Sequence, residues 1–298
     1  IPGYQTGVDT AHFQRVVEQH GFAIVRQTED LAPADRRMYA TRDVTATVEH
    51  MGLITASIVS KKLAAGLKHL VLDVKCGNGA VMQDRDKARA LAQSMVDVGN
   101  GAGMTTSALL TDMSVPLAWS AGNAVEVKEA VAYLSDARSR HPRLDAVVMA
   151  LGEKLLLQSG RFNAAADARA VLERVRDNGR ALEVWAQGIE AMGGDPRVTE
   201  SPESTLPRAA VVRAVKAKQS GQLSGYDVRQ VGMVVVELGG GRTQPDAPID
   251  HSVGLTAILE AGSTVQVGDD IAVLHAASEA DWERAEARLQ AALEWDSG

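Results

Sequence analysis

The order of three segments within residues 69–113 limits the possible folds more than any other feature. A buried strand is followed by an amphipathic helix and then by a second strand. Residues 69–75, HLVLDVK, are short, apolar and rich in branched side chains, as in a buried parallel strand. Residues 84–103 have the spacing of an amphipathic helix closed by glycine, and residues 104–113, MTTSALLTDM, form the next strand run. We therefore predict a parallel β-α-β unit. Residues 21–27, GFAIVRQ, predict a further buried strand.

Helical runs with glycine terminators follow this unit. The pattern predicts helices over 120–135 and 144–160, and a run of helices over 163–194. Taken with the strands, these helices predict an α/β fold in which helices flank a mixed sheet.

The chain changes character at residues 195–209, DPRVTESPESTLPRA, where three prolines lie among polar residues. Beyond it we expect short strands, including 231–242 and 263–276, and a final helix near 280–295. We therefore predict a domain over 1–200 and a smaller C-terminal α+β domain over 201–298.

Composition excludes several classes of protein. A net charge of −7, a pI near 5.5 and 4% aromatic residues argue against a nucleic-acid surface, so small molecules are the expected partners. Charges interrupt every apolar stretch before the roughly 20 residues of a membrane span, and we see no secretory signal. Cys76 is the single cysteine, which rules out an intrachain disulfide framework and favours a cytoplasmic protein.

Residues 42–62, RDVTATVEHMGLITASIVSKK, place polar side chains among apolar residues that are compatible with a helix. If residues 53–66 are helical, Ser57 and Lys61 lie four positions apart and share one face. The same helix places Ile54 and Ile58 beside them as apolar walls, and Arg42 precedes Ser57 by fifteen residues and can fold back toward that face.

An arginine fork, a lysine charge and a serine hydroxyl together suit a flat heterocycle with carbonyl and imide groups. The alternative is a solvated basic helix end. There the helix dipole would stabilise the charges of Lys61 and Lys62, and Ser57 would have no role beyond being tolerated. The residues alone leave both interpretations open.

Two glycine-rich segments are candidate phosphate loops. Residues 73–80, DVKCGNGA, and 99–103, GNGAG, contain neither the P-loop pattern nor a complete GxGxxG motif after a strand, so tight turns are the preferred interpretation. We expect Cys76 to pack rather than to act as a nucleophile. Glu126 and Glu129 follow a proline-containing loop, which suits either a cation site or ordinary acidic residues at a helix start.

Several segments, in order, closely resemble the thymidine and pyrimidine-nucleoside phosphorylases. The resemblance spans nearly the whole chain and rests on residues 31–82, 99–113, 120–131, 239–242 (GGGR), 249–254 (IDHSVG) and the GD…LHA stretch ending at 276. It implies the glycosyltransferase fold of nucleoside phosphorylases and phosphoribosyltransferases, followed by the family's C-terminal domain. Within it, residues 34–65 would belong to a helical lobe, 1–33 and 66–200 to an α/β lobe, and the cleft between the lobes would hold the substrate.

The resemblance also implies an activity. Members of that family use inorganic phosphate, without an organic cofactor, to cleave a pyrimidine nucleoside into free base and (deoxy)ribose 1-phosphate. Thymidine is the leading substrate expected here. Site residues follow by matching motifs: the base-binding set would be Arg42, Ser57 and Lys61, with Arg42 and Lys61 stabilising the departing base and Tyr39, Ile54, Ile58 and Val81 packing around the nucleoside.

The chain departs from the family pattern at its start. The family's phosphate loops, of the forms KHSTGG and GHTGGT, correspond to positions before Ile1, so we expect an N-terminally incomplete chain with negligible phosphorolysis by itself. Val81 stands where the family usually has an aromatic residue. The resemblance further implies a potassium ion held in part by Leu117, Ser120 and Glu129, and a homodimer for the full-length protein.

Two alternatives belong to other functional classes. One is a non-catalytic pyrimidine-binding or regulatory homologue that has lost phosphate chemistry. The other starts from residues 265–276, VQVGDDIAVLHA, which resemble half of a biotinyl or lipoyl carrier domain. A carrier presents a lysine at a hairpin tip, and the C-terminal region has no Met-Lys pair, which disfavours that reading.

Overall fold

The predicted β-α-β unit is present. The computed structural model describes residues 1–26, 50–242 and 247–296. Strands β1 (His69–Cys76) and β2 (Thr105–Asp112) pair in parallel from His69↔Thr105 to Cys76↔Asp112, and helix α4 (Arg85–Gly101) connects them. Asp84 caps the helix start by accepting from the backbone N–H groups of Asp86 and Lys87, which explains why the helix begins there.

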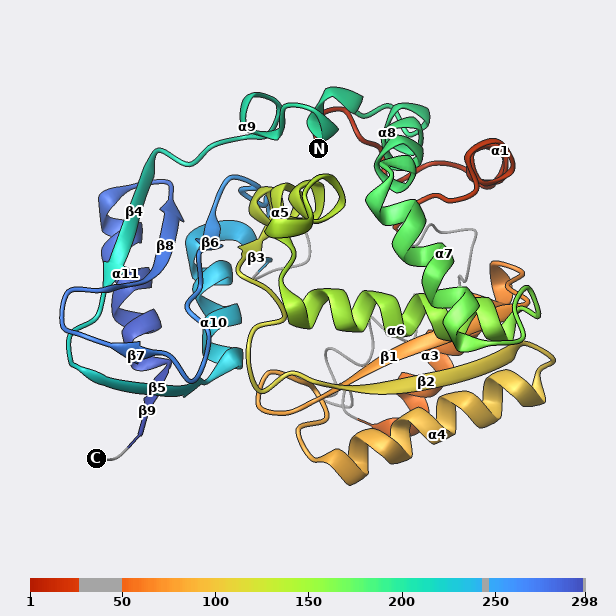
Figure 1. Cartoon of the computed structure of the whole chain (residues 1–298), viewed down its shortest axis with the longest axis horizontal. Coiled ribbons are helices and arrows are strands. Elements are labelled where there is room, and N and C mark those ends of the chain that lie inside the picture. The colour runs from red at the N-terminus through yellow and green to blue at the C-terminus, as the bar shows by residue number, and fades with distance from the viewer. Residues whose placement is uncertain (27–49, 243–246, 297–298) are drawn as a thin grey trace.

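Helices cover both faces of this short sheet. Helix α3 (Met51–Ala64) packs on α4, and Val59, Leu70, Val74, Leu91 and Met95 bury their side chains in the core between them and the sheet. On the other face lies α6 (Pro142–Gln158), so the two strands are sandwiched between α6 and α4 (Figure 1). The other α-helices described before residue 195 are α1 (Thr10–His20), α5 (Asn123–Ser135), α7 (Ala165–Asp177) and α8 (Arg180–Ala191).

Among the described residues, two small antiparallel sheets lie in the C-terminal third, and one of them also includes a short strand from earlier in the chain. One has the order β3-β6-β8-β4, with β3 (Ala121–Gly122), β4 (Val211–Lys216), β6 (Gly254–Thr256) and β8 (Asp270–Ala276). The other has the order β7-β5-β9, with β5 (Gly221–Tyr226), β7 (Thr264–Val265) and β9 (Leu293–Trp295). Helices α10 (Val228–Val235) and α11 (Glu279–Ala291) share the apolar core of this third (Figure 1). The strands expected within 263–276 and the final helix are confirmed.

The strand expected over 21–27 is wrong for its described part. Residues 22–26 have no regular structure, and Ile24 is 60% exposed. The backbone N–H of Arg26 donates to the carbonyl of Thr6, and the Tyr4 hydroxyl donates to the carbonyl of Ile24. These two bonds do not form a ladder, so within the described residues no strand pairs with this apolar run.

The strand expected within 231–242 is also wrong. Residues 228–235 form helix α10, and the π-helical turn η3 (Val236–Gly240) continues it. Val228, Val231 and Val234 are buried, and their spacing of three is a helical period. Valine content favoured a strand, but burial of one helical face in the core overrides that propensity.

The proline-rich segment holds only short helical turns, η2 (Pro196–Thr199) and α9 (Pro202–Thr205). Strand β3, from before this segment, pairs with β6, from after it, so one sheet includes residues of both parts. The division at residue 200 stays a prediction. Among the described residues, no helix is long and apolar enough to cross a membrane.

Candidate functional site

Helix α3 brings Ser57 and Lys61 together. Lys61 Nζ donates to Ser57 Oγ over 3.1 Å, which confirms that the two side chains share a helix face. Ser57 is only 6% exposed. Its hydroxyl oxygen accepts from the lysine, so the pair forms a polar contact on a nearly buried face of α3.

The two adjacent lysines differ in their surroundings. Lys61 is half-buried beside Ser57, whereas Lys62 is exposed. Ile54 and Ile58, the predicted apolar walls, are partly buried and pack against the core under β1. Helix α3 therefore presents a charged and a hydroxyl group next to apolar side chains.

Two predicted site residues lie outside the described residues: Arg42 of the base-binding set, and Tyr39, which would pack around the nucleoside. Convergence of Arg42 with Ser57 and Lys61 therefore stays a prediction, as do the roles of Ile54 and Ile58.

The loop after β1 is shaped by close packing. Gly77 has φ +112, and a Cβ there would lie 2.4 Å from Ser114 Oγ. A Cβ on Gly79 would lie 2.6 Å from Val228 Cγ1, so neither position has room for a side chain. These contacts support the tight-turn interpretation of GNGA. Val81, which follows the loop, is 66% exposed.

A large cavity of about 810 Å³ lies at the carboxyl ends of β1 and β2. Its walls come from the strand ends, the loop before α5, α5 itself and α10, and Lys75 and Asp112 contribute charge. Lys75 Nζ lies 2.7 Å from Asp73 Oδ2 and donates to Thr111 Oγ1 over 2.8 Å. Ligands of α/β proteins usually bind at this end of the strands, which makes the cavity a candidate binding site.

Leu117, Ser120 and Glu129, the predicted potassium ligands, all line this cavity. Glu129 Oε1 accepts the backbone N–H of Trp119 over 3.0 Å, so part of its hydrogen-bonding capacity is already used. Burial raises the pKa of the neighbouring Glu126, and the charge of Glu129 adds to that effect. In the part of the chain described, no group of three or more His, Cys, Asp or Glu side chains could hold a metal ion. Potassium binding stays a prediction.

Cys76 ends β1, and its Sγ lies 3.6 Å from the carbonyl oxygen of Thr111. It packs against the apolar core between β1 and α4, as expected for a packing cysteine.

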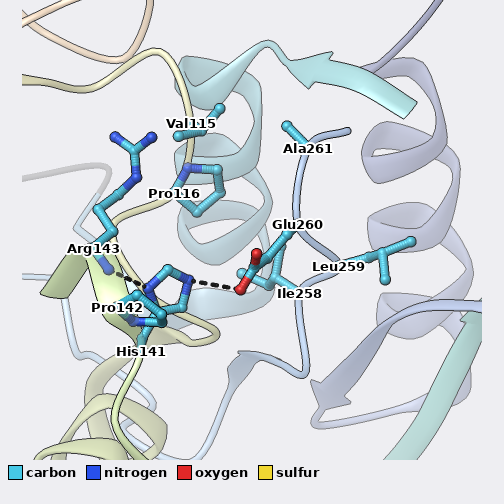
Figure 2. A pocket seen from close by; sticks show the side chains of 10 residues that line it. Val115, Pro116, His141, Pro142, Arg143, Ile258, Leu259, Glu260 and Ala261 are labelled. Carbon is cyan, nitrogen blue, oxygen red and sulfur yellow. Dashed lines mark hydrogen bonds and ion pairs between the residues drawn. The ribbon is translucent and has the colours of Figure 1, made fainter. Parts of the chain in front are cut away.

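A second, smaller cavity of about 190 Å³ separates the start of α6 from residues 258–261 (Figure 2). His141 caps α6, since its Nδ1 accepts the backbone N–H of Arg143, and its Nε2 lies 3.6 Å from Glu260 Oε1. Burial lowers the pKa of His141, against the opposing influence of the Glu260 and Glu129 carboxylates. Sequence reasoning missed this pair; Pro142 was a signal for the helix start, since proline is favoured at the first helical position.

Comparison with known proteins agrees with this architecture. Residues 1–182 match the model of the glycosyl transferase family a/b domain, and residues 222–296 match the pyrimidine nucleoside phosphorylase C-terminal domain. A thymidine phosphorylase of Agrobacterium fabrum is 48% identical over 290 residues, which cover 97% of this chain and 66% of that protein. A thymidine phosphorylase of Burkholderia cenocepacia is 50% identical over 280 residues, covering 94% of this chain and 64% of that protein.

A thymidine phosphorylase of Rhizobium meliloti is 48% identical over 283 residues, covering 95% of this chain. The chain thus spans 64–66% of the length of these relatives. Both domain models and all three relatives agree on one assignment, and the chain belongs to the thymidine and pyrimidine-nucleoside phosphorylase family.

Proposed function

We propose that this chain contributes the base-binding part of an enzyme that cleaves thymidine, or another pyrimidine nucleoside, with inorganic phosphate. The products are the free base and (deoxy)ribose 1-phosphate, which makes the enzyme a pentosyltransferase of pyrimidine nucleoside salvage. The observation that carries the proposal is the Lys61–Ser57 hydrogen bond on α3, because it places a cation and a hydroxyl donor side by side. The names of the relatives support the same reaction.

Cleavage of the bond between sugar and base requires groups that stabilise the departing base. A phosphate oxygen forms a bond to C1′ of the sugar as the bond from C1′ to the base breaks, and the electron pair of the broken bond goes to the base. Negative charge therefore grows on the pyrimidine carbonyls and ring nitrogen. Lys61, with Arg42, would stabilise that charge more in the transition state than in the bound nucleoside, and the Ser57 hydroxyl would donate to the same base.

Finer features belong to the same proposal. Inorganic phosphate is the co-substrate and no organic cofactor is required. Leu117, Ser120 and Glu129 would contribute to a potassium site at the large cavity, where all three side chains are lining residues. The nucleoside would be surrounded by Tyr39, Ile54, Ile58 and Val81. The full-length protein would be a cytoplasmic homodimer. The boundary between its two domains would lie near residue 200.

A non-catalytic pyrimidine-binding homologue is the alternative, and it shares the base site but not the phosphate chemistry. The test is thymine release from thymidine with and without inorganic phosphate, on protein made from the complete coding sequence and on the 298-residue chain in parallel. We expect phosphate-dependent release at a rate of about 1 s⁻¹ or more from the former and negligible release from the latter.

Binding of thymine without any phosphate-dependent release by the first protein would establish the non-catalytic alternative. Enzyme-like release by the 298-residue chain would show that the phosphate ligands lie within these residues and that their placement upstream is wrong.

A further inference from the structure

Asn78, the second residue after β1, connects the loop that follows this strand to the C-terminal third. Its Nδ2 donates to the carbonyl of Tyr226 over 2.7 Å, and its Oδ1 accepts the backbone N–H of Val228 over 3.1 Å. Tyr226 is the last residue of β5, and Val228 is the first of α10. One side chain therefore satisfies a backbone acceptor and a backbone donor on either side of Asp227.

Close backbone packing holds the loop at the same place. The backbone N–H of Gly79 donates to the carbonyl of Met113 over 3.1 Å, and Gly79 lies against the Val228 side chain. The loop thus lies between the segment after β2 and the start of α10. It has little freedom to shift while both Asn78 bonds are made.

The large cavity is lined both by the strand ends beside this loop and by α10. Lys75 and Asp112 line it at the strand ends, whereas Val228, Val231 and Val235 line it from α10. The separation of these walls therefore depends on how the loop after β1 meets the first residue of α10. The exposed Val81 is attached to the same loop three residues beyond Asn78.

We propose that Asn78 is a positioning residue for the nucleoside site. It fixes α10 against the carboxyl end of β1 and thereby sets the shape of the large cavity and the place of Val81, which the proposed function puts beside the nucleoside. This inference rests on the proposed phosphorolysis, and it assigns to the C-terminal third a part in shaping the site.

The structure offers a matched control. Asn100 makes the same pair of amide bonds, donating to the carbonyl of Thr106 over 3.0 Å and accepting its backbone N–H over 2.9 Å. It joins the end of α4 to the amino end of β2, whereas the cavity lies at the carboxyl end of that strand. Asn100 therefore makes an equivalent connection away from the cavity. Asn78→Ala and Asn100→Ala remove the same number of hydrogen bonds.

The experiment compares both variants, and Asn78→Asp, in protein made from the complete coding sequence. We expect Asn78→Ala to lower kcat/KM for thymidine phosphorolysis by about tenfold or more, and Asn100→Ala to change it by less than about twofold at a similar thermal midpoint. Asn78→Asp keeps the acceptor for Val228 but loses the donor to Tyr226, so its kcat/KM should lie between those of wild type and Asn78→Ala. Should Asn78→Ala not fold, Asn78→Asp against Asn100→Ala carries the comparison.

Hydrogen exchange provides the readout that does not depend on turnover. The Val228 amide should lose protection in Asn78→Ala and regain part of it in Asn78→Asp, whereas Asn100→Ala should expose the Thr106 amide instead. Equal kcat/KM losses in the two alanine variants, or unchanged Val228 protection in Asn78→Ala, would overturn the inference while leaving the proposed function intact. Absence of phosphorolysis in the unsubstituted protein would overturn both.

Discussion

At the scale of single residues, the hydrogen bond between Lys61 and Ser57 gives α3 its chemical character. The spacing of four residues made this contact predictable, since positions i and i+4 always adjoin on a helix. The bond pairs a charged donor with a nearly buried hydroxyl, and such a pair is more strongly coupled than it would be in water. Asn78 was not predictable, because its partner Tyr226 is 148 residues away and only the fold brings them together.

Lys61 should matter more for catalysis than Lys62. Lys62 is turned about 100° around the helix from Lys61 and is exposed, so it cannot address the same ligand as Ser57. We expect Lys61→Ala to lower kcat/KM by roughly a hundredfold or more, and Lys62→Ala to act mainly through stability. Steady-state phosphorolysis by both variants, matched for thermal midpoint, measures this. Equal losses, or a larger loss for Lys62→Ala, would mean that the wrong lysine has been assigned.

At the scale of elements, periodicity predicted the β-α-β unit and its helix because both are local patterns. The same reasoning failed for α10, where a valine-rich run buries one helical face in the C-terminal core. It also failed for residues 22–26, because an apolar run becomes a strand only when a neighbouring strand satisfies its backbone. Tertiary context, which a single segment does not contain, decided both cases.

The start of α6 should make stability depend on pH. His141 caps the helix through Nδ1, and burial lowers its pKa, so the folded protein holds the proton less tightly than the unfolded chain. Its contribution is therefore complete above the unfolded value of about 6.5 and is lost as the pH falls below it. The charged groups that act on it are Glu260, Glu129 and Arg143.

We expect urea midpoints between pH 7.5 and 5.5 to fall more for the wild type than for His141→Asn, in which asparagine keeps a capping acceptor without a titrating group. The difference between the two slopes isolates His141 from His275, whose pKa burial also lowers and which both proteins retain. Parallel slopes, or a steeper slope for His141→Asn, would contradict this account of the cap.

At the scale of the whole molecule, the C-terminal third is not a passive attachment. Strand β3 joins its sheet, α10 lines the large cavity, and Asn78 bonds the loop after β1 to the start of α10. The sequence indicated a change of character after residue 195. In the structure, strands from before and after that segment nevertheless pair in one sheet. Binding at the strand ends would therefore depend on both parts of the chain.

Helix α3 should present the pyrimidine site, and a crystal structure with bound thymine would show whether it does. We expect a carbonyl or imide group of thymine to lie within hydrogen-bond distance of both Ser57 Oγ and Lys61 Nζ. Thymine bound instead in the cavity beside His141, or in the large cavity with no contact to α3, would contradict it.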